Sequence, residues 1–126
     1  MLKIIYLEDE IYLEYLQKSV ETWKSDRILV NLRAALSTYV ESSIASLIVP
    51  INHDRLKGLV NLAEQELIDL AVCDEEYMEI CLSGTWIAEN EHSEVGIFAC
   101  ELSYESECFL YKLWQESQAE TSVITE

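Results

Sequence analysis

The chain has 126 residues, 24 of them acidic and 8 basic, which gives a formal net charge of −16 at neutral pH. Because nucleic acids and anionic membranes bind clustered Lys and Arg side chains, this charge disfavours both as direct partners. Half of the residues are hydrophobic, and a chain of this length buries a core without disulfides or metal ions. We expect one domain over residues 1–117 and a flexible tail over residues 118–126.

The acidic residues are concentrated in the second half of the chain. Residues 74–126 hold 13 acidic residues and one basic residue, whereas residues 1–73 hold 11 and seven. Such a field attracts a basic protein, although an acidic surface also simply improves solubility. No apolar run approaches the roughly 20 residues of a membrane helix, and the acids at 8–10 do not fit a signal peptide. The sequence therefore predicts a cytoplasmic location with reduced cysteines.

The first expected element is a strand over residues 2–7, which are rich in Ile, Leu and Tyr. Over residues 9–23, helical spacing would place aromatic and apolar side chains on one face: Tyr12, Tyr15, Leu16, Val20 and Trp23. Glu14 and Lys18 would then form a supporting i,i+4 pair. The alternative is a hairpin, in which residues 11–16 form a second strand after an acidic turn. We favour the helix and keep the hairpin open.

Alternating apolar residues predict a strand over residues 27–36. One side of it would carry Ile28, Val30, Leu32, Ala34 and Leu36. Residues 37–50 fit an antiparallel partner strand, with the turn near Ser37. Residues 52–66 have the clearest helical pattern, with Asn52 as the N-cap. Gly58 in the middle of this helix costs about 1 kcal/mol relative to Ala, so we expect a close approach between helix and sheet there.

Three further strands are expected over residues 66–73, 76–89 and 95–102, and the last two form a hairpin. The longest of them alternates clearly between two faces. The inward face carries Met78, Ile80, Leu82, Trp86 and Ala88. The outward face carries Tyr77, Glu79, Cys81, Ser83 and Thr85.

The last expected helix begins after Ser103, whose hydroxyl makes it a good N-cap. Glu105 and Glu107 follow in the first turn, where they favour the positive end of the helix dipole. Long alternating strands interrupted by a few helices are typical of an antiparallel sheet with helices on one side. The fold class that we predict is α+β, with a mainly antiparallel sheet and about three helices packed on one face.

One acidic motif resembles part of a known family. YLEDE at residues 6–10 resembles the start of a response-regulator receiver domain, in which acids follow the first strand. A receiver also needs an Asp at the end of the third strand, and the third apolar run, SLIVPI, has none. A degenerate receiver-like domain is therefore a minor alternative.

Metal and nucleophile patterns are weak. Cys73, Cys81, Cys100 and Cys108 are eight, 19 and eight residues apart, whereas the ligands of structural zinc sites usually lie two to four residues apart. Neither histidine stands beside a Ser or Cys in a strained elbow. We expect no metal ion, no cofactor and no catalytic residue, and a non-catalytic protein is favoured over an enzyme.

The leading functional hypothesis is a protein-interaction or regulatory module with an acidic docking surface, which binds a basic protein or a second copy of itself. An exposed patch on the long strand would carry the candidate residues Tyr77, Glu79, Thr85 and Ile87. The acids Asp74, Glu75 and Glu76 before that strand would add charge. His92 in the acidic turn ENEHSE is a candidate for a pH-responsive group, because its charge changes near neutral pH.

The alternative hypothesis is a small-molecule-binding protein or an enzyme with a pocket between sheet and helices. Its polar groups would be Glu8, Asp9, Asp74 and His53. This alternative requires those side chains to converge in a concave, mostly apolar pocket.

Three stretches of the sequence, YLEDEIYLEYL, SVETW and FLYKLWQE, also resemble small acidic cyanobacterial proteins of unknown function. The resemblance spans most of the chain. It implies a single cytosolic domain, and it implies no activity and no catalytic residue.

Overall fold

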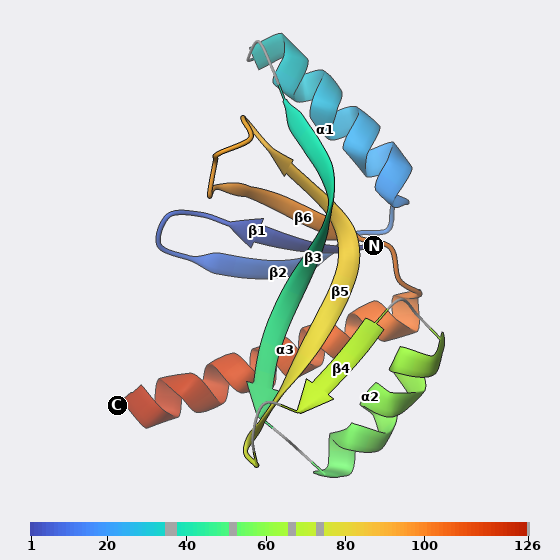
Figure 1. Cartoon of the computed structure of the whole chain (residues 1–126), viewed down its shortest axis with the longest axis vertical. Coiled ribbons are helices and arrows are strands. Elements are labelled where there is room, and N and C mark those ends of the chain that lie inside the picture. Colours follow the sequence, from blue (N-terminus) through green and yellow to red (C-terminus); the bar gives the residue numbers. More distant parts are fainter. Residues whose placement is uncertain (35–37, 51–52, 66–67, 73–74, 126) are drawn as a thin grey trace. The chain divides into compact units, whose positions relative to one another are not determined.

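The fold is an α+β arrangement of three helices and six strands over the described residues 1–34, 38–50, 53–65, 68–72 and 75–125 of a computed structural model (Figure 1). In chain order the elements are β1 (Leu2–Tyr6), β2 (Ile11–Tyr15), α1 (Val20–Ala34), β3 (Tyr39–Pro50), α2 (His53–Gln65), β4 (Ile68–Val72), β5 (Tyr77–Ala88), β6 (Gly96–Cys100) and α3 (Tyr104–Thr125). The predicted fold class is confirmed. The domain boundary at residue 117 and the flexible tail stay predictions.

The six strands form a sheet with the order β2-β1-β6-β5-β3, and β4 also pairs with β5. Neighbouring pairs run antiparallel: β1 with β2, β1 with β6, β4 with β5 and β5 with β6. The mainly antiparallel sheet is thus confirmed. The receiver-like alternative is wrong, because receiver domains have a parallel, doubly wound sheet. That all helices pack on one face of the sheet stays a prediction.

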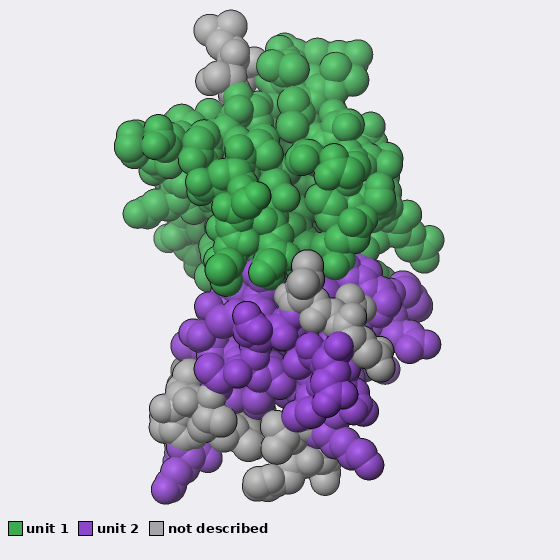
Figure 2. All heavy atoms as spheres, turned by 45° about the vertical axis from the view of Figure 1, so that its right-hand side comes forward, with its two compact units in different colours: residues 1–44, 83–101 green, residues 45–82, 102–126 purple. Residues whose placement is uncertain are grey.

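The chain divides into two compact units, which are shown in different colours in Figure 2. Unit 1 comprises residues 1–44 and 83–101, and unit 2 comprises residues 45–82 and 102–126. The long strands β3 and β5 each contribute residues to both units. Each unit is therefore described by itself.

In unit 1, β1 and β2 form a hairpin, so the helix predicted over residues 9–23 is wrong and the hairpin alternative is correct. The Leu7 N–H donates to the Glu10 carbonyl over 2.9 Å and closes the turn. Lys3 lies opposite Glu14, and their side chains form an ion pair of 3.1 Å. The predicted pair between Glu14 and Lys18 is therefore replaced by a cross-strand pair.

The helix α1 occupies most of the segment that alternation predicted to be a strand over residues 27–36, so this prediction is also wrong. Ser19 is its N-cap, because its hydroxyl accepts the Thr22 N–H over 3.2 Å and its carbonyl accepts the Trp23 N–H over 3.0 Å. The Glu101 carboxylate accepts the N–H of Val20 over 3.0 Å. These bonds satisfy donors at the helix N-terminus that would otherwise lack partners. The predicted strand pairing with residues 37–50 is replaced by pairing between β3 and β5, and the turn at Ser37 lies outside the described residues.

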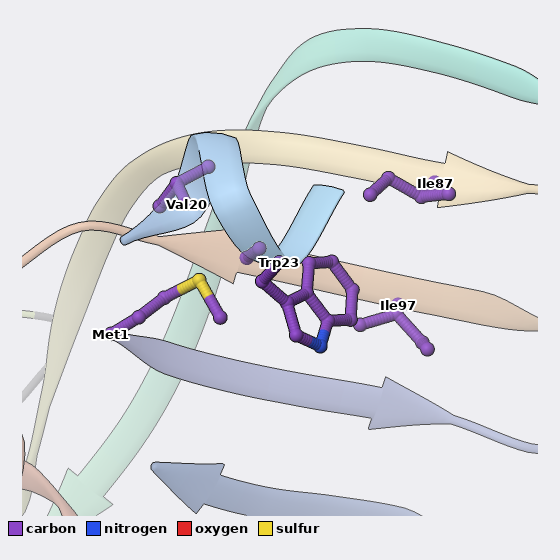
Figure 3. Close-up of a cluster of buried hydrophobic side chains, with 6 residues drawn as sticks. Met1, Val20, Trp23, Ile87 and Ile97 are labelled. Atoms are coloured by element: carbon purple, nitrogen blue, oxygen red, sulfur yellow. The ribbon is translucent and has the colours of Figure 1, made fainter. Parts of the chain in front are cut away.

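One side of the unit 1 sheet carries a hydrophobic cluster under α1 (Figure 3). Its buried members are Met1, Val20, Trp23, Ile87, Ile97 and Ala99. The Trp23 indole lies between Met1 and Ile97 (Figure 3), and the Lys3 ammonium is 5.6 Å from the centre of its ring. The other side of this sheet is buried as well, at Leu2, Ile4, Leu13, Phe98 and Cys100. Burial on both sides explains why β6 has a continuous apolar sequence.

In unit 2, α2 packs against β4 (Figure 1) and comes close to α3. A Cβ atom at Gly58 would lie 2.8 Å from Cε2 of Phe109 on α3, so the close approach predicted at Gly58 involves a helix and not the sheet. The N-cap predicted for α3 is confirmed, because the Ser103 hydroxyl accepts the Ser106 N–H over 3.3 Å. The predicted cap at Asn52 lies outside the described residues.

Candidate interaction surface

The unit 2 parts of β3, β4 and β5 have one buried and one exposed side. The side chains of Leu47, Val49, Met78, Ile80 and Leu82 are buried. Residues in the alternate positions point the other way, and we call this set the open face: Ser46, Ile48, Asp69, Ala71, Tyr77, Glu79 and Cys81. Ile48 keeps 61% of its surface exposed and Tyr77 keeps 39%. Large apolar groups therefore reach the surface on this side of unit 2.

Strand pairing fixes the arrangement of the open face. Asp69 of β4 lies opposite Cys81 of β5, and Ala71 lies opposite Glu79. The Ser46 hydroxyl of β3 lies 3.6 Å from the Cys81 sulfur, so Ser46, Cys81 and Asp69 form a row across three strands. Residues from three separate segments of the chain thus form one continuous surface.

All charged side chains of the open face are acidic. The described strands β3, β4 and β5 contain Glu41, Asp69 and Glu79 and no Lys or Arg. Glu75 and Glu76 precede β5 and are exposed. Asp74, which the sequence also suggested, lies outside the described residues. The surface therefore combines apolar groups with a purely negative charge.

The Cys81 thiol lies next to a carboxylate of the same face. It donates a hydrogen bond of 3.1 Å to the Glu79 carboxylate, and this bond raises the pKa of the thiol above its ordinary value, with further contributions from burial and from the Asp69 charge. The hydrogen bond with the Ser46 hydroxyl acts in the opposite direction but is the weaker influence. Because the thiolate is the reactive species, this environment disfavours nucleophilic chemistry at Cys81.

The sequence placed Thr85 and Ile87 on the same patch as Tyr77 and Glu79, and the structure separates them. Thr85 and Ile87 belong to unit 1, where Thr85 lies opposite Ala99 and is half-buried. Ile87 is only 2% exposed and belongs to the cluster under α1. The expected exposure of Ile87 is therefore wrong, because a helix covers the corresponding side of unit 1. A binding role for Tyr77, Glu79, Glu75 and Glu76 stays a prediction.

The structure describes the side chains of only two of the four residues proposed for a small-molecule pocket. Glu8 and Asp9 are exposed in the turn between β1 and β2 of unit 1. The side chains of His53 and Asp74 lie outside the described part. Within that part, no three His, Cys, Asp or Glu side chains are arranged to hold a metal ion. His92 is exposed in the turn before β6, where its N–H donates to the Asn90 side chain over 3.0 Å, and its pH response stays a prediction.

The sequence did not predict the burial of two polar residues. Ser106 and Glu107 in the first turn of α3 are each 1% exposed. The sequence predicted only that Glu107 interacts favourably with the positive end of the helix dipole. The available signal was their spacing from Leu110, which is also buried: Ser106 and Glu107 precede it by four and three residues, and such residues share a helix face. The carboxyl group of Glu107 is thus part of the interior of unit 2.

Comparison with known proteins places the chain in a family. Residues 1–118 match the family described as Alr0857-like. The chain belongs to the Alr0857-like family. This membership confirms the resemblance to an uncharacterised family, and the description of the Alr0857-like family names no activity. No curated protein and no solved structure matches the chain. In the described part of this Alr0857-like chain, none of the helices has the length and apolarity needed to cross a membrane.

Proposed function

We propose that this protein is a non-catalytic interaction module of the cytoplasm, and that its open face docks a protein segment with apolar and basic side chains. The observation that carries the proposal is the exposure of Ile48 and Tyr77 on a surface whose strand residues include only acidic charges. Exposed apolar groups next to carboxylates are costly to leave in water and useful in an interface.

The chemistry of the partner follows from the two kinds of side chain. Ile48 and Tyr77 supply apolar contact area, and aromatic residues in particular are enriched at interfaces. Asp69 and Glu79 lie on neighbouring strands of the open face and attract Lys or Arg, which speeds association and excludes acidic proteins. The net charge of −16 also attracts a basic partner to the chain as a whole.

The position of β3 supports an extended partner segment. β3 stands at one end of the strand order, and Ile48 in its unit 2 part is exposed. Natural edge strands are often blunted by Lys, by Pro or by a bulge, and residues 45–49 of β3 contain no Lys and no Pro. An extended segment would pair with β3 through its backbone and cover Ile48 with its side chains.

The experiment is photo-crosslinking in the native host, with a photoreactive amino acid placed at Ile48. The matched control carries the same amino acid at Val60, an exposed apolar position on α2 of the same unit. We expect a basic protein to be crosslinked from position 48 and not from position 60. Crosslinking of the same proteins from both positions would refute a specific docking site.

The electrostatic part is tested on the captured protein. Asp69→Asn combined with Glu79→Gln removes two charges from the open face, and Glu91→Gln combined with Glu94→Gln removes two exposed charges from the turn before β6. We expect the first pair of substitutions to weaken binding by roughly threefold to tenfold at low salt, with little effect of the control pair. Equal effects of the two pairs, or binding that is indifferent to salt, would contradict charge recognition at this face.

A further inference from the structure

The second half of helix α1 carries an exposed stripe of apolar and charged residues. Val20 and Trp23 point into the core cluster, whereas Leu29 and Val30 are 51% and 55% exposed. Asp26 precedes this pair by one helical turn and Arg33 follows it by one turn, and both are exposed. Residues spaced by three and four lie on one helix face. We call Asp26, Leu29, Val30 and Arg33 the outer stripe.

The segment around the outer stripe differs in charge from the rest of the chain. Residues 18–33 hold four of the eight basic residues and only two acidic ones, Glu21 and Asp26. Two copies of a chain with a net charge of −16 repel each other over most of their surface. Where this segment of one copy faces the same segment of the other, no excess of carboxylates faces carboxylates, and the arrangement depends on which individual charges lie opposite each other.

We propose that α1 pairs with α1 of a second copy, in antiparallel orientation, about a twofold axis that passes between Leu29 and Val30. The antiparallel arrangement places Asp26 opposite Arg33 of the second copy, and Arg33 opposite Asp26 of the second copy. Both ends of the stripe then hold an ion pair, and the apolar residues between them are covered. A twofold symmetric dimer requires a surface patch that is complementary to itself, and the outer stripe meets this requirement.

The charges of the stripe exclude the parallel arrangement. Parallel helices would place Asp26 opposite Asp26 and Arg33 opposite Arg33, which is repulsive at both ends. Within one copy, Asp26 already accepts a hydrogen bond of 3.1 Å from Lys18, so in the dimer this carboxylate would lie between two cations. The second copy of the chain is therefore the occupant that matches both the apolar and the charged parts of the stripe.

The dimer is expected to be weak. A contact through one helix per copy buries less than the roughly 800 Å² per partner of a standard stable interface. Dimers should therefore be populated only at high protein concentration. Sedimentation equilibrium with the full chain over a concentration series, up to the solubility limit, measures the dissociation constant directly.

Charge reversal tests the antiparallel register. Asp26→Lys places Lys opposite Arg33 at both ends of the dimer, and Arg33→Glu places Glu opposite Asp26 at both ends. Each variant alone should raise the dissociation constant by roughly tenfold. An equimolar mixture of the two should form heterodimers with an affinity near that of the wild type, because every facing pair is then of opposite sign.

The matched control is Lys57→Glu, which changes the net charge as Arg33→Glu does. Lys57 is exposed on α2, outside residues 18–33, so its replacement should leave the dimer intact. Circular dichroism verifies that all variants fold. A wild-type chain that stays monomeric at every concentration would overturn the proposal, as would dimers that resist both reversals or a mixture that fails to restore association.

Discussion

Replacing Gly84 by Ala tests how closely β5 and β6 approach each other in unit 1. A Cβ atom at this position would clash with the carbonyl oxygen of Ala99 and would lie 2.6 Å from Cζ of Phe98. Ala99 and Phe98 are both buried, so neither side has free space into which it can shift. Overpacking of this kind typically costs about 1–3 kcal/mol. We therefore expect Gly84→Ala to lower the free energy of unfolding by about 2 kcal/mol.

Urea unfolding followed by tryptophan fluorescence measures this change. With a slope of about 1–3 kcal/mol per molar urea for small proteins, the midpoint should fall by roughly 1 M. Ser83→Ala is the matched control, because Ser83 is the exposed neighbour of Gly84 and such surface changes usually stay within about 0.5 kcal/mol. Phe98→Leu should not rescue Gly84→Ala, since the clash with the backbone oxygen remains. Equal stability of the two alanine variants would refute the close approach of the strands.

Three further predictions concern buried groups and the thiol. Glu107→Ala should lower the free energy of unfolding by about 1–3 kcal/mol, because it empties a buried polar position. Glu105→Ala in the same turn should lower it by less than about 1 kcal/mol. Urea unfolding of the two variants measures the difference. Trp23→Ala should cost about 3–5 kcal/mol and lower the melting temperature, because it empties the centre of the core cluster; an unchanged melting temperature would contradict that position. Glu79→Gln should lower the pKa of the Cys81 thiol, because it removes the hydrogen-bonded carboxylate that raises this pKa. Alkylation of Cys81, mapped by mass spectrometry between pH 7 and pH 9, should then be faster at each pH than in the wild type, and unchanged rates would be evidence against the hydrogen bond.

Elements with a strong local signal were predicted correctly from the sequence. The alternation in β5, the helical spacing in α2 and the N-cap at Ser103 each depend on a few consecutive residues, so they can be identified without knowledge of the rest of the fold. The same alternation placed Tyr77 and Glu79 on the side opposite to Met78 and Ile80, as the structure does. Family membership and fold class were also within reach of the sequence.

The segments from β2 to α1 were predicted wrongly because two local patterns compete in each of them. Residues 11–15 have a helical spacing, but pairing with β1 places Leu13 opposite Ile4 and buries both side chains. Residues 28–34 alternate as a strand would, but the cap at Ser19 starts a helix that continues through them. Of the apolar residues that produced the alternation, α1 exposes Val30, Leu32 and Ala34, so the local pattern did not report which side chains are buried.

Composition, charge and the strongest periodicities determined by themselves an acidic α+β chain with an antiparallel sheet. Only the tertiary structure decided which apolar residues are covered. Ile87 is buried because α1 lies over its side of the sheet, Ile48 is exposed on the open face, and Glu107 is enclosed within unit 2. The reason is that burial depends on contacts between segments distant in sequence, whereas periodicity reports only the spacing within one segment.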